Sequence, residues 1–399
     1  MTSLVLVGLL GAATIAAVVL GNGNPAVALA PCLVGVLLWA ISSLPLRVPM
    51  LTLLALSWTL EIAGDAFAGG VVQTPLYVVG SLLFAKLNLT FPVDALVFSG
   101  FDILLVVLAV VVVRRHVTRS RIDRVGWIDT PRPIRQFAVV ALLALAWMTA
   151  FGLLRGGSFR FALWQVTRHI YLPFVYLLMA EALRGPVDAT AVGRIVLGAG
   201  VFRSAEALIL RQMYPSTDLF PHATTHHDSV LFATCVGILL AMILEKPTRR
   251  TLKICALLLP IFLGGMIANN RRLVWTEVAL VAVFFFLVTG WGRVKRFFVR
   301  ALIVASLPLL VYGAAGWSSK AGIFTPVQTF RSMFDANVDG STRWRDWENF
   351  DLVFTFRQNP LFGSGFGHPF VQAIALPDIT RAYELEPYVP HNSVLGLWA

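Results

Sequence analysis

The sequence has little charge. Charged residues make up only 13% of its 399 residues, whereas hydrophobic residues make up 57% and the mean hydropathy is +0.77. A soluble globular chain of this length could not cover itself with so few polar side chains, so soluble enzymes and regulators are excluded. The composition predicts an integral membrane protein whose first partner is the lipid bilayer.

Cysteine is also scarce. The three cysteines, Cys32, Cys235 and Cys255, lie within apolar runs, and no companion residues stand at metal-ligand spacing. Disulfides and thiolate metal sites are therefore not expected. The N-terminus lacks the basic segment of a secretory signal, so we expect the first apolar run to be retained.

Long apolar runs recur along nearly the whole chain. Each is long enough, at about 1.5 Å per residue, to cross a hydrocarbon core about 30 Å thick. They lie at residues 3–20, 26–43, 49–64, 95–113, 136–154, 163–183, 191–210, 229–244, 252–268, 273–290 and 299–316, and a further run opens at His391. The pattern predicts an all-α fold, a polytopic bundle of about 11–12 transmembrane helices with a long outer-face loop that contains amphipathic helices.

Three regions follow from this pattern. Residues 1–316 are expected to form the transmembrane domain and residues 317–390 the outer, periplasmic loop. Residues 391–399 begin another transmembrane helix but are too short to span, so we expect the chain to be truncated.

The net charge of +11 resides mainly in short loops between apolar runs, notably 114–135, 246–253 and 293–300. Such a distribution is typical of cytoplasmic loops and does not call for a nucleic-acid partner. It places the N-terminus in the cytoplasm. The segments 212–227, 269–272 and 317–390 then lie on the outer face.

Membrane insertion favours arginine on the cytoplasmic side, so arginines on or near the outer face require a structural or functional explanation. Arg203 lies about 12 Å deeper in its helix than Arg211. Glu206, or Asp102 from another helix, could neutralise it, so a structural charge pair and an anion site are equally supported. Arg168 and His169, two turns into their helix, leave the same two interpretations open as candidate substrate-lining residues.

Arg271 and Arg272 occupy a tight turn that opens a helix. Guanidinium groups beside a helix N-terminus attract phosphate, so a pyrophosphate-like ligand is favoured over interfacial snorkelling.

The segment around His222, His226, His227 and Asp228 has histidines at metal-ligand spacing. A loop precedes the helix here, and Asp228-Ser229 is typical of a helix N-cap, so capping and substrate lining are favoured over a metal.

Gly363 to Gly367 form G-x-G-x-G outside any nucleotide-binding context, which favours a tight turn packed against the membrane domain. Before it, residues 343–356 predict an interfacial amphipathic helix with Trp344 and Trp347 on its apolar side and Glu348 largely on the polar side.

His391 is the sharpest catalytic candidate. Pro390 suits the first position of a helix, which places His391 in the first turn, where the helix dipole favours neutral imidazole. A neutral imidazole can accept a proton. The alternative is that His391 and Asn392 simply cap the helix.

Four short motifs follow one another along the chain: N-N-R-R-L, R-W-x-x-W, N-P-L-x-G-x-G-x-G and H-N-S-x-L. This order, over residues 260–399, resembles the O-antigen ligase and O-antigen polymerase superfamily of bacterial envelopes. The resemblance implies a glycosyltransferase of GT-C-like, polytopic type, which acts without metal or other cofactor on the outer face of the bacterial cytoplasmic membrane.

By that resemblance, the enzyme moves a glycan from an undecaprenyl-pyrophosphate carrier to a hydroxyl of another glycan or of a lipid core. His391 would be the base, and Arg271 or Arg272 would hold the pyrophosphate. Arg203 and Arg211 are further candidates for pyrophosphate binding, because of their charge and their depth in the membrane and not because of the resemblance. Trp344, Trp347 and Asn392 are candidate substrate-lining residues. The alternatives are a polyprenyl-glycan transporter or flippase and a non-enzymatic partner of a polysaccharide synthase.

Overall fold

A computed structural model describes residues 2–20, 23, 25–60, 76–87, 98–118, 131–183, 185–214, 222–319, 321–332, 340–378 and 387–397. Within these ranges every regular element is a helix, and the sole β pairing is an isolated bridge between Lys86 and Ser99. The predicted all-α class is confirmed. The chain divides into two compact units: the first unit is Met1–Ile128 with Leu178–Phe297, and the second unit is Asp129–Leu177 with Phe298–Ala399.

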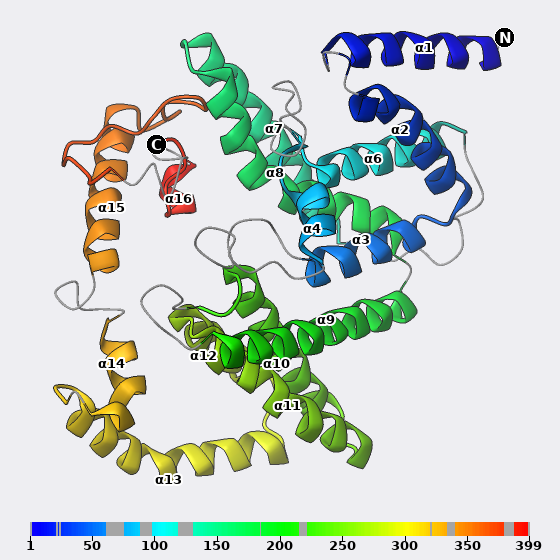
Figure 1. Ribbon diagram of the computed structural model, residues 1–399. Coiled ribbons are helices and arrows are strands. Elements are labelled where there is room, and N and C mark those ends of the chain that lie inside the picture. The colour runs from blue at the N-terminus through cyan, green and yellow to red at the C-terminus, as the bar shows by residue number, and fades with distance from the viewer. Residues whose placement is uncertain are drawn as a thin grey trace. The chain divides into compact units, whose positions relative to one another are not determined.

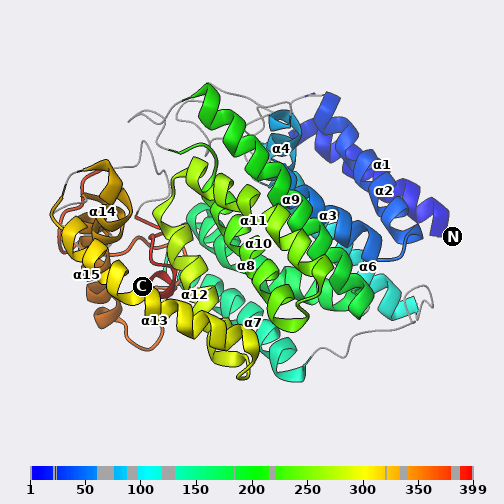
Figure 2. The ribbon, with the colours of Figure 1, turned by 90° about the horizontal axis from the view of Figure 1, so that it is seen from below.

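The first unit is helical throughout its described residues (Figure 1). The helices are α1 (Thr2–Leu20), α2 (Pro25–Ser43), α3 (Arg47–Thr59), α4 (Tyr77–Phe84), α6 (Gly100–Thr118), α9 (Pro186–Met213), α10 (His226–Glu245), α11 (Arg249–Asn269) and α12 (Arg272–Val288). Helix α9 packs on α3 and α11, and α10 contacts α9, α11 and α12. Figure 2 shows α9, α10 and α11 side by side.

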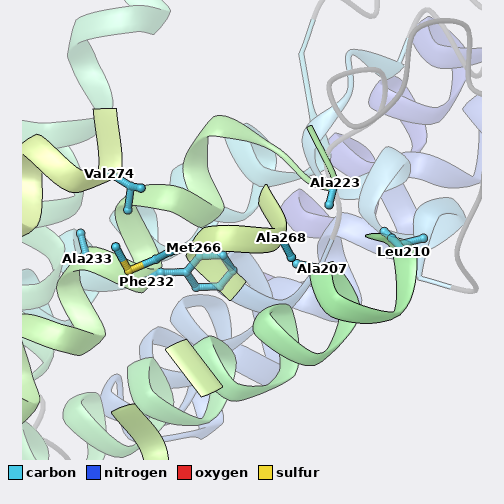
Figure 3. Close-up of a cluster of buried hydrophobic side chains, with 8 residues drawn as sticks. All are labelled: Ala207, Leu210, Ala223, Phe232, Ala233, Met266, Ala268 and Val274. Atoms are coloured by element: carbon cyan, nitrogen blue, oxygen red, sulfur yellow. The ribbon is translucent and has the colours of Figure 1, made fainter. Parts of the chain in front are cut away.

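Small residues let these helices approach closely. Gly200 of α9 lies against the Cys235 side chain of α10, and Gly265 of α11 lies against Ser204 of α9, where a Cβ would stand 2.8 Å from the serine Cβ. Close backbone approach of this kind is how helices associate where lipid replaces water. The buried cluster in Figure 3 takes Phe232 from α10 and Met266 from α11, both fully buried.

The second unit is built from α7, α8 and the C-terminal region. Its elements are α7 (Arg132–Leu154), most of α8 (Phe159–Ala182) and of α13 (Arg293–Gly316), η1 (Gly322–Phe324), α14 (Thr325–Ser332), α15 (Gly340–Gln358) and α16 (Ser393–Gly396). Helix α16 packs on α15. The predicted helix is therefore present as α15, but its amphipathic character is not confirmed: Glu348 and Asp351 are buried, whereas Phe350 and Phe354 are exposed. Its place at a membrane interface stays a prediction.

Among the described residues, four helices are long and apolar enough to cross a membrane: Arg132–Leu154, His226–Glu245, Arg249–Asn269 and Lys295–Gly316. Two shorter apolar helices, Pro31–Ser43 and Leu273–Val288, fall below that length. Helices also form over the other predicted runs, but the full count of spans stays a prediction. In the most apolar stretch of Lys295–Gly316, no residue is buried within the protein. Its exposed apolar surface is compatible with contact with lipid.

Local capping shifts some predicted boundaries. Helix α6 begins at Gly100 rather than near residue 95, because Ser99 and Asp102 exchange hydrogen bonds: Asp102 Oδ2 accepts from Ser99 N at 2.8 Å, and Asp102 N donates to Ser99 Oγ at 3.2 Å. This reciprocal arrangement satisfies amide groups that a helix N-terminus leaves open.

Candidate functional site

His391 is held by a buried carboxylate of α15. Its Nδ1 lies 3.2 Å from Oε1 of Glu348, and its backbone N–H donates to both carboxylate oxygens at 3.1 and 3.2 Å. Glu348 is 1% exposed, whereas the His391 side chain is 38% exposed. A carboxylate accepts hydrogen bonds only, so Nδ1 donates to Glu348, and in the neutral imidazole Nε2 is the acceptor nitrogen.

The helix that follows His391 begins later than the sequence predicts. Helix α16 starts at Ser393, and Asn392 Oδ1 caps it by accepting from Val394 N and Leu395 N, each at 3.2 Å. The prediction that His391 stands in the first turn is therefore wrong: the asparagine side chain takes the N-cap position and leaves His391 before the helix. Glu348, rather than the start of a helix, therefore orients the imidazole.

A second polar contact and an aromatic ring complete the support of this segment. Asn392 Nδ2 donates to Asn349 Oδ1 at 2.9 Å, next to Glu348 on α15. Trp344, one turn earlier, meets the His391 ring edge to face with centroids 4.9 Å apart. Trp347 is half-buried on the same helix. Two adjacent residues of α15 thus fix both His391 and Asn392.

His391 opens into a cavity of about 350 Å³ within the second unit. The cavity is lined by Gln165, Arg168, His169, Phe366, Tyr388, Val389, Pro390, His391 and Gly396. Its size lies in the range of small-ligand sites. Helix α8 supplies one wall and the segment before α16 the other, so residues more than two hundred positions apart face the same space.

The predicted glycine turn forms part of this wall. Gly365 and Gly367 have φ of +80° and +97°, and a Cβ on Gly365 would stand 2.6 Å from Gly152 Cα in α7. Phe366 N donates to Met148 O at 3.1 Å, and Gly367 N donates to Gln165 Oε1 at 2.5 Å. The turn therefore packs on α7, a candidate membrane span, as predicted, and carries Phe366 to the cavity.

Aromatic contacts support residues of the cavity lining. Tyr388 stacks on Phe161 with ring centroids 3.6 Å apart and planes 5° apart, while its carbonyl accepts from Gln165 Nε2 at 2.7 Å. His169 lies parallel to Phe366 at 6.3 Å between centroids. The predicted substrate-lining pair Arg168 and His169 is thereby brought together with His391.

Arg203 has a different environment from Arg168. It is 2% exposed, and its Nε and Nη2 donate to the two oxygens of Asp228, each at 2.7 Å. Its Nη1 also pairs with Glu206. The cross-helix partner in the structure is thus Asp228 of α10, while Asp102, the partner suggested from sequence, caps α6. Two carboxylates surround Arg203, which favours the structural interpretation over an anion site.

Arg211 and Arg271 meet around the α11–α12 turn of the first unit. Arg211 Nε donates to Ala268 O at 2.8 Å, and Arg271 Nη2 donates to Thr224 O at 3.3 Å. Asn269 is fully buried and locks the turn to the loop before α10, since its Oδ1 accepts from Thr224 N at 2.9 Å. The predicted turn is present at Asn270 and Arg271, and α12 begins at Arg272, whose side chain lies outside the described residues.

His222 joins this basic cluster. Its Nδ1 lies 3.2 Å from Asn269 O. Burial lowers the pKa of His222, and the positive charges of Arg271 and Arg211 lower it further, against a smaller opposing effect of backbone hydrogen bonds. The imidazole is therefore neutral at pH 7, and a bound anion would favour its protonation.

The neighbouring histidines, His226 and His227, lie at the start of α10. Thr225 is the N-cap of α10, with Asp228 at N3 completing a capping box, so the predicted cap at Asp228-Ser229 is wrong by one turn. His226 and His227 are exposed in the first turn. Among the described residues, no group of three His, Cys, Asp or Glu side chains could hold a metal ion.

Glu348 and Gln165 were missed from sequence. Helical periodicity assigned Glu348 to a polar, solvent-facing side, and Gln165 stood within an apolar run. The signal that identifies them is long-range: each is buried and binds a segment that lies far away in sequence. The prediction that His391 lines one cavity with Arg203, Arg211, Arg271 and Arg272 stays a prediction, because those arginines belong to the first unit and His391 to the second.

Comparison with protein-family models, with curated proteins and with solved structures finds no match for this chain.

Proposed function

We propose that this chain is a membrane glycosyltransferase that moves a glycan from an undecaprenyl-pyrophosphate carrier to an acceptor hydroxyl. It would act on the outer face of the bacterial cytoplasmic membrane, as the resemblance to O-antigen ligases and polymerases implies. One observation carries the proposal: an imidazole oriented by a buried carboxylate faces a cavity of small-ligand size that also contains an arginine.

In this proposal His391 is the general base. Its Nε2 takes the proton of the acceptor hydroxyl as that oxygen attacks the anomeric carbon of the donor glycan. The new bond from oxygen to the anomeric carbon forms while the bond from that carbon to the pyrophosphate oxygen breaks, and the electron pair leaves with undecaprenyl pyrophosphate. A positioned base contributes about 10² to 10⁴ in rate.

Pyrophosphate is already a good leaving group, so the remaining requirement is stabilisation of its charge. Two arginines and a neutral histidine gather around a helix N-terminus in the first unit, and such a set favours a phosphate ligand. Arg211 and Arg271 are the members whose contacts are described. Among the arginines expected to bind pyrophosphate, they support the proposal better than Arg203, which two carboxylates already surround.

The test is formation of a covalent product. Purified protein in vesicles receives a labelled lipid-pyrophosphate glycan and an acceptor glycan in the presence of EDTA. We expect the label to join the acceptor, without a divalent metal. Movement of the labelled lipid between leaflets with no transfer would instead establish the transporter alternative and end this proposal.

A further inference from the structure

Arg168 is the arginine whose charge is left available beside His391. It lies on α8 with an exposed side chain and lines the His391 cavity. Within the described part of the chain, no hydrogen bond or ion pair engages its guanidinium. In this it differs from Arg203, which two carboxylates bind, and from Arg211 and Arg271, which donate to backbone carbonyls.

The charge around the cavity is unbalanced. Its described lining includes the basic side chains Arg168, His169 and His391 but no carboxylate. Glu348, which holds His391, is 1% exposed, and its oxygens already accept hydrogen bonds from the backbone and ring of His391. A ligand in the cavity therefore meets one uncompensated positive charge.

An arginine without a counter-charge, in a helix expected to lie in the membrane, has a high free-energy cost unless a ligand or solvent compensates its charge. We infer that Arg168 binds an oxyanion of the substrate, a phosphate or a carboxylate, next to the hydroxyl that His391 activates. The planar guanidinium offers two parallel donors, which suits such groups. This inference deepens the proposed function and rests on it for the substrate's identity.

Two sources can supply that oxyanion. One is the pyrophosphate of the lipid-linked donor, and the other is an acidic group on the acceptor, such as the carboxylate of a uronic acid. Tyr388 and Phe366 in the lining offer aromatic surface for a sugar ring, so both sources fit the cavity. The two sources can be distinguished by small molecules that bind in the cavity, pyrophosphate for the donor and glucuronate for the acceptor.

The experiment measures protection of individual histidines in the whole protein. Diethyl pyrocarbonate modifies the protein in the presence of inorganic pyrophosphate, glucuronate or glucose, and mass spectrometry follows the peptides that contain His391, His222 and His116. We expect pyrophosphate or glucuronate to slow modification of His391, and glucose not to. His222 reports separately on the basic cluster of the first unit, and His116, an exposed histidine of α6, is the reference.

Arg168→Gln should weaken the protection of His391 by about ten- to hundredfold in probe concentration, the effect of losing a charged hydrogen bond. Arg194→Gln, which removes an exposed arginine from α9, should leave protection unchanged. Protection by pyrophosphate alone identifies the donor as the source of the oxyanion. Protection by glucuronate alone identifies the acceptor, and protection by both probes indicates an oxyanion site that does not distinguish them.

The inference is overturned if neither oxyanion protects His391, if glucose protects it equally, or if protection survives in Arg168→Gln. Because protection requires no turnover, its result is independent of the transfer assay. Protection without transfer leaves the oxyanion site standing and ends the proposed function, whereas transfer without protection ends only the role of Arg168.

Discussion

Two histidines of this chain pair with glutamates, and their surroundings differ. His116 Nε2 lies 3.0 Å from Glu181 Oε2 at the end of α6, where the histidine side chain is 55% exposed. His391 pairs through Nδ1 with a carboxylate that is almost fully buried, and its ring borders a cavity. The second arrangement fixes the orientation of the ring, because Nδ1 is held by a buried carboxylate, whereas the exposed pair at His116 has no such anchor.

Glu348→Gln therefore tests orientation of the imidazole. The amide keeps an oxygen for the backbone N–H of His391 but loses the negative charge that holds the Nδ1 proton. We expect kcat to fall by about 10- to 100-fold, less than the 10² to 10⁴ of a lost base, with little change in KM. Glu181→Gln is the matched control and should leave both constants unchanged.

Thermal unfolding of the same Glu348→Gln sample separates catalysis from folding. If the variant keeps its melting temperature and its kcat, Glu348 serves only to anchor the backbone before α16. A rise in KM with unchanged kcat would likewise contradict a positioning role, since an orienting residue acts on the chemical step.

His222 predicts a dependence of stability on pH. Its folded-state pKa is lowered by burial and by the two arginines, so the unfolded state binds more protons near pH 6. Stability from this group is present above the unfolded pKa of about 6.5 and is lost as pH falls below it toward the lowered folded value. His222→Asn should reduce the fall in melting temperature between pH 7.5 and about pH 5.5.

The comparison requires melting curves of both proteins across that pH range, with His227→Asn as the control on an exposed neighbour. A fall of equal size in wild type and His222→Asn would show that other groups dominate the acid response. Added pyrophosphate should raise the melting temperature of the wild type, because a ligand of the folded state stabilises it.

The residues that sequence reasoning found are those whose position alone is unusual. Arg168 and Arg271 stand out because charge within or at the ends of apolar helices is costly, and His391 because Pro390 indicates the start of a helix. Glu348 could not be found in this way, since helical periodicity gives the side of a helix but not what covers it. Its role depends on a segment 43 positions later that folds back onto α15.

At the scale of elements, the glycine turn fixes the cavity wall by close backbone contact. Gly152 of α7 touches the backbone of Gly365 and Phe366 with no room for a Cβ. Gly152→Ala should destabilise the protein by about 1–3 kcal/mol through overpacking. Gly198→Ala, in α9, meets nothing within 4 Å and should be neutral or stabilising by about 0.5–1 kcal/mol.

Denaturant unfolding of the two alanine variants gives the comparison directly. Equal stability of Gly152→Ala and Gly198→Ala would contradict the packing of the turn on α7. The sequence predicted this turn from its glycines, but the partner surface on α7 has no local signal beyond a single glycine in an apolar run.

The ion-pair network of α9 and α10 gives the second prediction at this scale. Arg203→Leu leaves Asp228 and Glu206 without their counter-charge in a buried site, which should cost about 3–5 kcal/mol. The combination Arg203→Leu with Asp228→Asn should recover part of that loss. Arg211→Leu, whose contact is a carbonyl oxygen, should cost less.

Melting temperatures of these variants separate structure from ligand binding. If Arg203→Leu melts like the wild type and loses only pyrophosphate binding, Arg203 is an anion ligand and its pairing with Asp228 is secondary. The sequence predicted Glu206 as a partner from helical spacing, whereas Asp228 requires knowledge of how α9 and α10 cross.

For the whole molecule, composition and hydropathy were sufficient to predict the helical class. Of the predicted apolar runs, those at 136–154, 229–244, 252–268 and 299–316 form helices long and apolar enough to span, while α3 ends at Thr59 and is shorter than predicted. Hydropathy averages over a window and does not detect the caps that end a helix. The inside and outside assignment rests on loop arginines and stays a prediction.

The central claim is that His391 performs the chemical step of glycan transfer. Its most direct test compares wild type, His391→Gln and His116→Gln for both donor binding and transfer in one preparation. We predict that His391→Gln binds the lipid-pyrophosphate donor like the wild type but transfers glycan about 10² to 10⁴ times more slowly, while His116→Gln is unaffected. Transfer by His391→Gln at the wild-type rate would contradict the account.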